Sequence, residues 1–285
     1  IELFDEELEP VVKGGPLVDK LIALGRKQNE DGGKPPKGAA LALAQIALGA
    51  KKFDAAGEFY KIAFDEAEDD ERRAALLQNW GLGLLLEEQY ADSADVLRRG
   101  ADEEKYPLDA AAFYHFLAGA LALAEKTDEA LAAAEKAAAL DPESAEFAGR
   151  KGWVLYHAKR LDDARKAYME VLEKFDDDFD ETGDRDTMKQ TRMILSAIAV
   201  ERGNMDDGEE WIEQVLDEYP DDSGALNDLA YLWADRNKNL DRSLAMIEKA
   251  LAADPENAAY QDSLGWVYYR LARHKEAAAA LEKAI

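Results

Sequence analysis

A five-residue stretch occurs twice in this chain of 285 residues, as GWVLY at 152–156 and as GWVYY at 265–269. The copies are 113 residues apart, which corresponds to three units of 34 residues, ten additional residues at 179–188 and one inside RNKNL. Without these additional residues the two copies lie three repeat periods apart, which indicates tandem repeats. This constrains the fold more than composition does, because each unit must bury its apolar face mainly against its neighbours.

Seven successive units can be aligned on two positions that hold small side chains throughout. Close approach of two helix axes leaves no room for a branched side chain, so such positions have a physical reason to stay small. The residues at position 8 are Ala44, Gly81, Ala118, Gly152, Ser196, Ala230 and Gly265. Those at position 20 are Ala56, Ala94, Ala130, Ala164, Gly208, Ser243 and Ala277. The alignment therefore predicts closely packed helix pairs.

The last unit carries the pattern most fully, with Leu264, Gly265 and Tyr268 in a first helix and Ala277 in a second. This resembles the tetratricopeptide repeat (TPR) family, bacterial type, whose unit reads L-G-x-x-Y and then A-x-x-x-F. The resemblance implies an all-α fold, a right-handed superhelical solenoid of about seven helix-turn-helix TPR units. We expect looser packing where Arg98 occupies position 24. The units are placed at 37–70, 74–110, 111–144, 145–178, 189–222, 223–257 and 258–285.

The two ends of the chain differ from the repeats. Residues 1–36 do not fit the unit; the helical spacing of Leu17, Leu21 and Leu24 predicts an N-terminal helix on the first repeat, followed by a linker. At the other end, stopping at Ile285 leaves the seventh unit without the polar capping helix that solenoids generally need. We expect either that the native chain continues or that a partner, including a second copy of this chain, covers this C-terminal edge.

Charge and composition exclude several classes of partner. A net charge of −26 repels nucleic-acid phosphates and anionic lipid surfaces, so we expect no nucleic-acid partner. The longest uncharged stretch, 110–124, has 15 residues, too few to span a bilayer, so we expect no direct membrane insertion. The chain contains no cysteine, so no disulfide framework or thiolate site exists. Cytoplasmic and bacterial envelope or periplasmic locations both stay open.

Function is expected on one face of the first helix of each unit. Positions 2, 5, 9 and 12, with 6 and 13, share this face, and the family resemblance implies that it lines the concave side and contacts ligands. These positions also include Asp228, Asp235 and Arg270. Core packing and ligand contact are both open interpretations of the individual aromatics. The predicted peptide-binding residues are Asn79, His115, Phe116, Arg150, Trp153, Tyr156, His157, Asn227, Tyr231, Trp266 and Tyr269.

The acidic stretch at 175–188 offers a second, weaker candidate site. Asp178, Asp180 and Thr182 match the first three ligand positions of a calcium loop. Lys189 stands at the twelfth position, where such a loop needs a bidentate Glu. A solvated acidic loop is therefore the favoured interpretation.

Catalytic chemistry has no recognisable motif. The chain holds no G-x-S-x-G, phosphate loop or H-E-x-x-H. His115 and His157 fall on inner positions of adjacent repeats and could meet, but a metal site shared by them would lack a third ligand. We therefore expect no enzyme activity, no cofactor and no metal. The leading hypothesis is a protein–protein interaction scaffold that binds a peptide or partner helix. Alternatives are the TPR arm of a larger enzyme or of an envelope or transport assembly, and self-assembly through the C-terminal edge.

Overall fold

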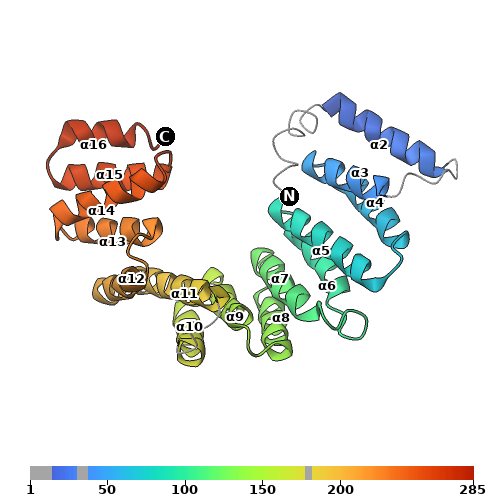
Figure 1. The fold of residues 1–285 in the computed structure, drawn as a ribbon, viewed down its shortest axis with the longest axis horizontal. Helices are drawn as coiled ribbons and strands as arrows, with labels where there is room; N and C mark the ends of the chain where they lie inside the picture. Colours follow the sequence, from blue (N-terminus) through green and yellow to red (C-terminus); the bar gives the residue numbers. More distant parts are fainter. Residues whose placement is uncertain (1–14, 31–37, 177–181) are drawn as a thin grey trace. The chain divides into compact units, whose positions relative to one another are not determined.

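The computed structural model describes residues 15–30, 38–176 and 182–285, and over these ranges the chain forms helices and turns without a β-strand (Figure 1). No helix in these ranges is both long enough and apolar enough to cross a membrane. The helices are α2 (Gly15–Glu30), α3 (Ala39–Gly49), α4 (Phe53–Asp65), α5 (Asp70–Leu86), α6 (Tyr90–Gly100), α7 (Ala110–Leu123), α8 (Thr127–Leu140), α9 (Ala145–His157), α10 (Leu161–Phe175), α11 (Thr182–Glu201), α12 (Met205–Glu218), α13 (Ser223–Asp235), α14 (Leu240–Ala253), α15 (Ala258–Arg270) and α16 (His274–Leu281).

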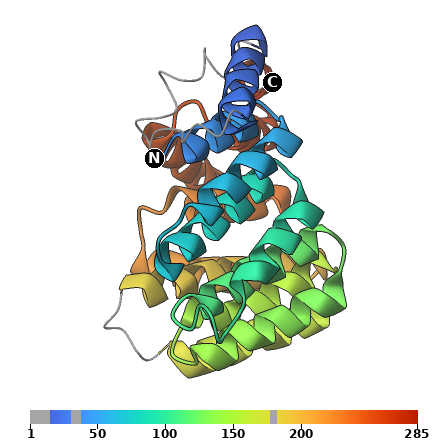
Figure 2. The same cartoon turned by 90° about the vertical axis from the view of Figure 1, so that its right-hand side faces the viewer.

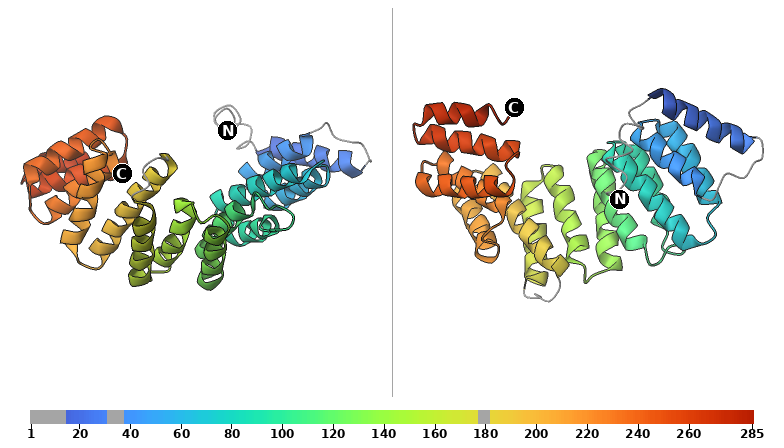
Figure 3. Two further views of the ribbon diagram at one scale, coloured as in Figure 1. Left: turned by 60° about the horizontal axis from the view of Figure 1, so that its bottom comes forward. Right: turned by 45° about the horizontal axis from the view of Figure 1, so that its top comes forward.

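The chain divides into two compact units, Ile1–Arg160 and Leu161–Ile285. In the first unit, α3 with α4, α5 with α6 and α7 with α8 form hairpins, and α9 packs on α8 (Figure 2). In the second, α11 with α12, α13 with α14 and α15 with α16 form hairpins, and α10 packs on α11 (Figure 3). The second helix of each of these hairpins packs on the first helix of the next within the same unit, as tandem repeats require.

The turns that follow the first helices of the repeats share one backbone geometry. The second residue after each first helix has positive φ, and its N–H reaches back three residues, as Glu88 N does to Leu85 O at 3.1 Å. The next backbone N–H reaches back five residues, as Gln89 N does to Leu84 O at 2.8 Å. This double return is a Schellman motif, which satisfies the last carbonyls of the helix and reverses the chain. The positive-φ residues are Lys51, Glu88, Glu125, Lys159, Gly203, Asn237 and Ala272.

Helix starts use side-chain caps at four of the first helices. Asp69, Ser144, Asp222 and Asn257 each accept a hydrogen bond from the backbone N–H three residues ahead. These caps supply partners for N–H groups that a helix cannot pair internally. The sequence therefore specifies both ends of the first helices locally.

The small positions pack as predicted, with one correction to the register. A Cβ added to Gly81 would lie 2.6 Å from Cγ of Leu97, just as one added to Gly265 would lie 2.6 Å from Cγ of Leu281. Leu97 is fully buried, so it occupies position 24 of the repeat at 74–110, and Ser93 occupies position 20. The expectation that Arg98 fills position 24 is wrong: its guanidinium pairs with Asp95 at 2.9 Å on the surface. The loose packing expected there is consequently not found.

Helix α2 packs on the first hairpin through a different face from the one expected. Val18 and Ile22 are buried, whereas Leu17 and Leu24 are 47% and 63% exposed. Gly25 explains the choice, because a Cβ there would lie 2.6 Å from Leu43 Cδ1. The glycine lets α2 approach closely on the Val18 side, so Leu17 and Leu24 of the predicted leucine stripe are exposed and Leu21 is half-buried.

The acidic stretch is partly helical. Helix α11 begins at Thr182, so residues 182–188, expected in a loop, form its first turns. Met188 is buried, and the ammonium group of Lys189 lies 3.2 Å from Asp222 Oδ2. The loop interpretation is therefore wrong for 182–188, and residues 177–181 lie outside the described part.

Candidate functional site

The predicted binding residues lie on the first helices, which contact one another within each unit. In the first unit α7 contacts both α5 and α9, and in the second unit α13 contacts α15. We call the faces that carry positions 2, 5, 6, 9, 12 and 13 of these helices the inner face of each unit. Each inner face is described by itself.

On the inner face of the first unit, His115 of α7 meets α9. His115 is 2% exposed, and its ring lies 5.2 Å from those of Phe116 and Phe147. Arg150 Nε donates to His115 Nδ1 at 3.3 Å, and His115 Nε2 lies 3.1 Å from Glu146 Oε1. Arg150 Nη2 also lies against His115 Nε2, so the guanidinium, which only donates, faces both ring nitrogens.

Burial, reinforced by the Arg150 guanidinium, lowers the pKa of His115 to about 3. Glu146 favours the charged ring, but its side chain is 66% exposed and its field is screened by water. His115 therefore stays neutral at physiological pH. Its buried contacts indicate that it holds Arg150 in place rather than binding a ligand directly.

Arg150 in turn covers Trp153 of the same helix. Its guanidinium carbon lies 5.1 Å from the Trp153 ring centroid, and Trp153 is half-buried against the hydrophobic core. The centroid of the His157 ring lies 3.7 Å from that of Trp153, with the two rings tilted by 33°. The same ring lies edge-on to Tyr156, with the centroids 5.9 Å apart. The structure thus brings most of the predicted residues of this unit into one contiguous cluster.

Two other predicted residues of the first unit have different surroundings. Asn79 is exposed, and its Nδ2 donates to the carbonyl of Ala75 in its own helix at 2.8 Å. Phe116 is half-buried and packs against the core cluster. The Phe116 contact fits core packing better than ligand contact.

The inner face of the second unit presents its aromatics to solvent. Tyr231 of α13 is 41% exposed and Tyr269 of α15 is 53% exposed. Tyr269 stacks on Trp266 at 5.4 Å with an interplanar angle of 20°, and Arg270 covers Trp266 at 5.6 Å. Trp266 itself packs partly against the core, and its Nε1 is buried without a hydrogen-bond partner in the described part of the chain.

Next to these aromatics, Asn227 and Asp228 form a polar pair on α13. Asn227 is 8% exposed, and its Nδ2 donates to Asp228 Oδ1 at 2.9 Å. Among the described residues no donor reaches Asn227 Oδ1. Burial raises the pKa of Asp228. Asp228 is missing from the predicted site residues although it occupies an inner-face position; its partial burial depends on packing that position alone does not reveal.

The described residues contain no group of three or more His, Asp or Glu side chains arranged to hold a metal ion. His115 and His157, which lie on adjacent helices, contact different partners. Of the weak calcium candidates, Asp178 and Asp180 lie outside the described residues, and Thr182 lies in the first turn of α11.

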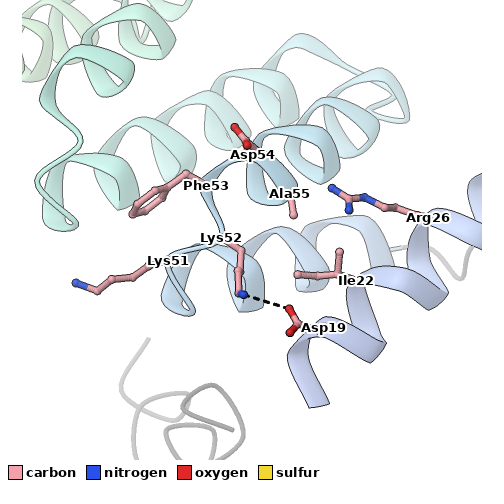
Figure 4. A pocket seen from close by; sticks show the side chains of 8 residues that line it. All are labelled: Asp19, Ile22, Arg26, Lys51, Lys52, Phe53, Asp54 and Ala55. Carbon is pink, nitrogen blue, oxygen red and sulfur yellow. Dashed lines mark ion pairs between the residues drawn. The ribbon is translucent and has the colours of Figure 1, made fainter. Parts of the chain in front are cut away.

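A pocket of about 410 Å³ lies between α2 and the start of α4 (Figure 4). Its basic side chains already have acidic partners: Lys52 pairs with Asp19 at 3.2 Å and Arg26 with Glu58 at 2.8 Å. Lys51 likewise pairs with Glu87 at 3.0 Å. The three pairs neutralise the basic side chains of the lining, and the Lys52–Asp19 and Arg26–Glu58 pairs also fasten α2 to the first hairpin, so a structural role accounts for them.

Comparison with known proteins agrees with the architecture. Residues 121–181 and 234–285 each match a tetratricopeptide repeat family model. The TPR repeat-containing protein PA4667 of Pseudomonas aeruginosa is 32% identical over 90 residues, which are 32% of this chain. The match spans only 15% of the length of that relative.

Two solved structures share the fold. The pilF protein of Pseudomonas aeruginosa superposes with a TM-score of 0.57 at 16% identity, over 74% of this chain and 90% of that one. A tetratricopeptide repeat protein from Parabacteroides merdae gives a TM-score of 0.56 at 18% identity, over 94% of this chain and 91% of that one. Residues 121–181 and 234–285 therefore contain tetratricopeptide repeats, and the other described hairpins share the fold of the two solved structures.

Proposed function

We propose that this protein is a non-catalytic scaffold that binds a peptide or partner helix on the inner face of its second unit. The family supports the general mode of action, since tetratricopeptide repeats generally serve as protein- and peptide-binding scaffolds. One observation supports the choice of the inner face of the second unit. Among the described residues, Tyr231 and Tyr269 are the large aromatic side chains that stand out as exposed, and both lie on this face.

Exposed aromatics are costly in water and effective in interfaces. A tyrosine ring offers a large rigid contact area with a polar tip, and aromatic residues are enriched among the side chains that contribute most to binding. The stack of Tyr269 on Trp266 fixes one ring in position before binding. The inner face of the first unit is the weaker candidate, because His115 and Phe116 are used in packing.

A selection from a random peptide library displayed on phage tests this function. The parent protein is expected to enrich a peptide consensus, and the variant Tyr231→Ala/Tyr269→Ala should bind the selected peptide about tenfold or more weakly. Leu108→Ala is the control, because Leu108 is 95% exposed in the loop between α6 and α7 of the first unit. Equal affinity of the parent and the tyrosine variant would exclude this surface.

A further inference from the structure

The polar pair beside the tyrosines lacks a cation. Asp228 accepts one hydrogen bond from Asn227, and no Lys or Arg in the described ranges forms an ion pair with it. Glu209 of the same unit shows the usual arrangement, because its largely buried carboxylate pairs with Arg236 at 3.0 Å and Lys238 at 2.8 Å. Removing a carboxylate from water costs free energy, and without a paired cation this cost is not offset. A positively charged ligand would offset it.

Asn227 adds a second acceptor with the same requirement. Its Oδ1 is closed to water and has no donor in the described part of the chain, although buried acceptors in proteins are nearly always paired. Because the Asn227 amide is held against Asp228, both acceptors lie within one side chain's reach of each other. Asp228 is only partly buried, so its carboxylate is the first contact, and a donor to Asn227 Oδ1 requires the Asn227 amide to rotate toward the ligand.

The neighbouring groups favour a planar cation. Tyr231 follows Asn227 by four residues and Asp228 by three, so its exposed ring lies on the same face of α13. A guanidinium carries five N–H donors in one plane and stacks on aromatic rings, whereas an ammonium is a compact, strongly hydrated charge. Exposed Asp235 and Asp262 on this face, and the net charge of −26, attract cations from a distance.

We propose that the inner face of α13 and α15 binds a basic peptide segment, with an arginine side chain donating to Asp228 and Asn227 and stacking on Tyr231. This inference rests on the proposed function and specifies the chemical class of its partner. One guanidinium would supply both the cation that Asp228 lacks and the donor that Asn227 Oδ1 lacks.

Fluorescence anisotropy with a fluorescein-labelled peptide of alternating arginine and alanine tests the inference at physiological ionic strength. The same peptide with neutral citrulline replacing arginine is the reference, and we expect it to bind at least about tenfold more weakly. Asp228→Asn should lower the affinity for the arginine peptide about tenfold, and Asp228→Glu should restore part of it. Circular dichroism verifies that each variant is folded.

Asp217→Asn is the matched control, because it removes the same unit charge from an exposed position on α12, a second helix of the same unit outside the inner face. A loss of less than about twofold in this variant supports a specific site, since exposed charges are well screened. Equal losses in Asp228→Asn and Asp217→Asn would overturn the inference by showing attraction through net charge alone.

The two proposals fail in distinguishable ways. If arginine and citrulline peptides bind equally and Tyr231→Ala/Tyr269→Ala weakens both, the inner face binds peptides and the arginine claim is wrong. If neither peptide binds, the arginine claim is again wrong, while a consensus of other composition in the phage selection still supports the scaffold.

Discussion

Gly81 lies directly over Leu97, close enough that a single added Cβ would come within 2.6 Å of the leucine side chain. The contact joins the first and second helices of one hairpin. It shows why position 8 is restricted to small residues: the facing leucine fills the space that a side chain would need.

Replacing Gly81 with alanine should destabilise the protein. Leu97 is fully buried and has nowhere to move, so overpacking costs about 1–3 kcal/mol, offset by up to about 1 kcal/mol of helix propensity. Gly265→Ala is the matched control, because its facing Leu281 is 39% exposed and can turn away. Urea unfolding followed by circular dichroism should show the lower midpoint for Gly81→Ala; a larger loss for Gly265→Ala would contradict this packing.

At two equivalent Schellman turns, exchanging glycine and alanine should change stability in opposite directions. Ala272 has φ near 60°, a conformation that costs a side chain about 1–2 kcal/mol, so Ala272→Gly should be neutral or stabilising. Gly203 has φ near 79° at the same turn position, and Gly203→Ala should destabilise by about 1 kcal/mol. Thermal melting of both variants compares them, and a stabilising Gly203→Ala would disprove the assigned turn.

Glu209 should be a stability hot spot of the second unit. Its Oε1 accepts from the Trp233 indole Nε1 at 2.6 Å, and Trp233 is 2% exposed. Truncation to alanine leaves that N–H without its acceptor and Lys238 without its carboxylate partner, whereas Arg236 keeps Asp206, at a cost of about 2–3 kcal/mol. Glu210→Ala, an exposed neighbour, should change the unfolding midpoint very little. Similar midpoints for the two variants would argue against the network.

The buried neutral His115 predicts a dependence of stability on pH. Its folded pKa of about 3 lies below the unfolded value near 6.5, so on acidification the unfolded chain takes up a proton that the folded chain does not. Stability is therefore complete above about pH 6.5 and falls at about 1.4 kcal/mol per pH unit below it. His115→Gln should reduce the loss measured by urea unfolding between pH 7 and pH 5. An unchanged loss in the variant would show that His115 is protonated in the folded protein.

The hairpin architecture could be predicted from sequence because its determinants are local and periodic. Small residues at two positions and capping side chains at helix starts are readable without tertiary information. The one-residue register error arose at Ser93 and Ala94, which are both small and both buried, so size alone could not decide between them. The contact of Gly81 with Leu97 identifies the correct frame, and the twelve-residue spacing of positions 8 and 20 in other repeats, as in Gly265 and Ala277, agrees with it.

The errors that remain come from tertiary packing. In α2, Leu17 with Leu24 and Val18 with Ile22 have helical spacings that could each face the core, and the close approach at Gly25 selects the second pair. Periodicity placed His115 and Arg150 on one face, but their contact across 35 residues depends on how α7 docks on α9. Burial of Asp228 likewise arises from tertiary surroundings.

Hydrogen exchange of the protein with and without a phage-selected peptide tests the central claim most directly. If the inner face of the second unit binds the peptide, amide exchange slows in α13 and α15 more than in their hairpin partners α14 and α16. Tyr231→Ala/Tyr269→Ala should abolish this difference at the same peptide concentration. Slowed exchange confined to α14 and α16, or to the first unit, would contradict the account.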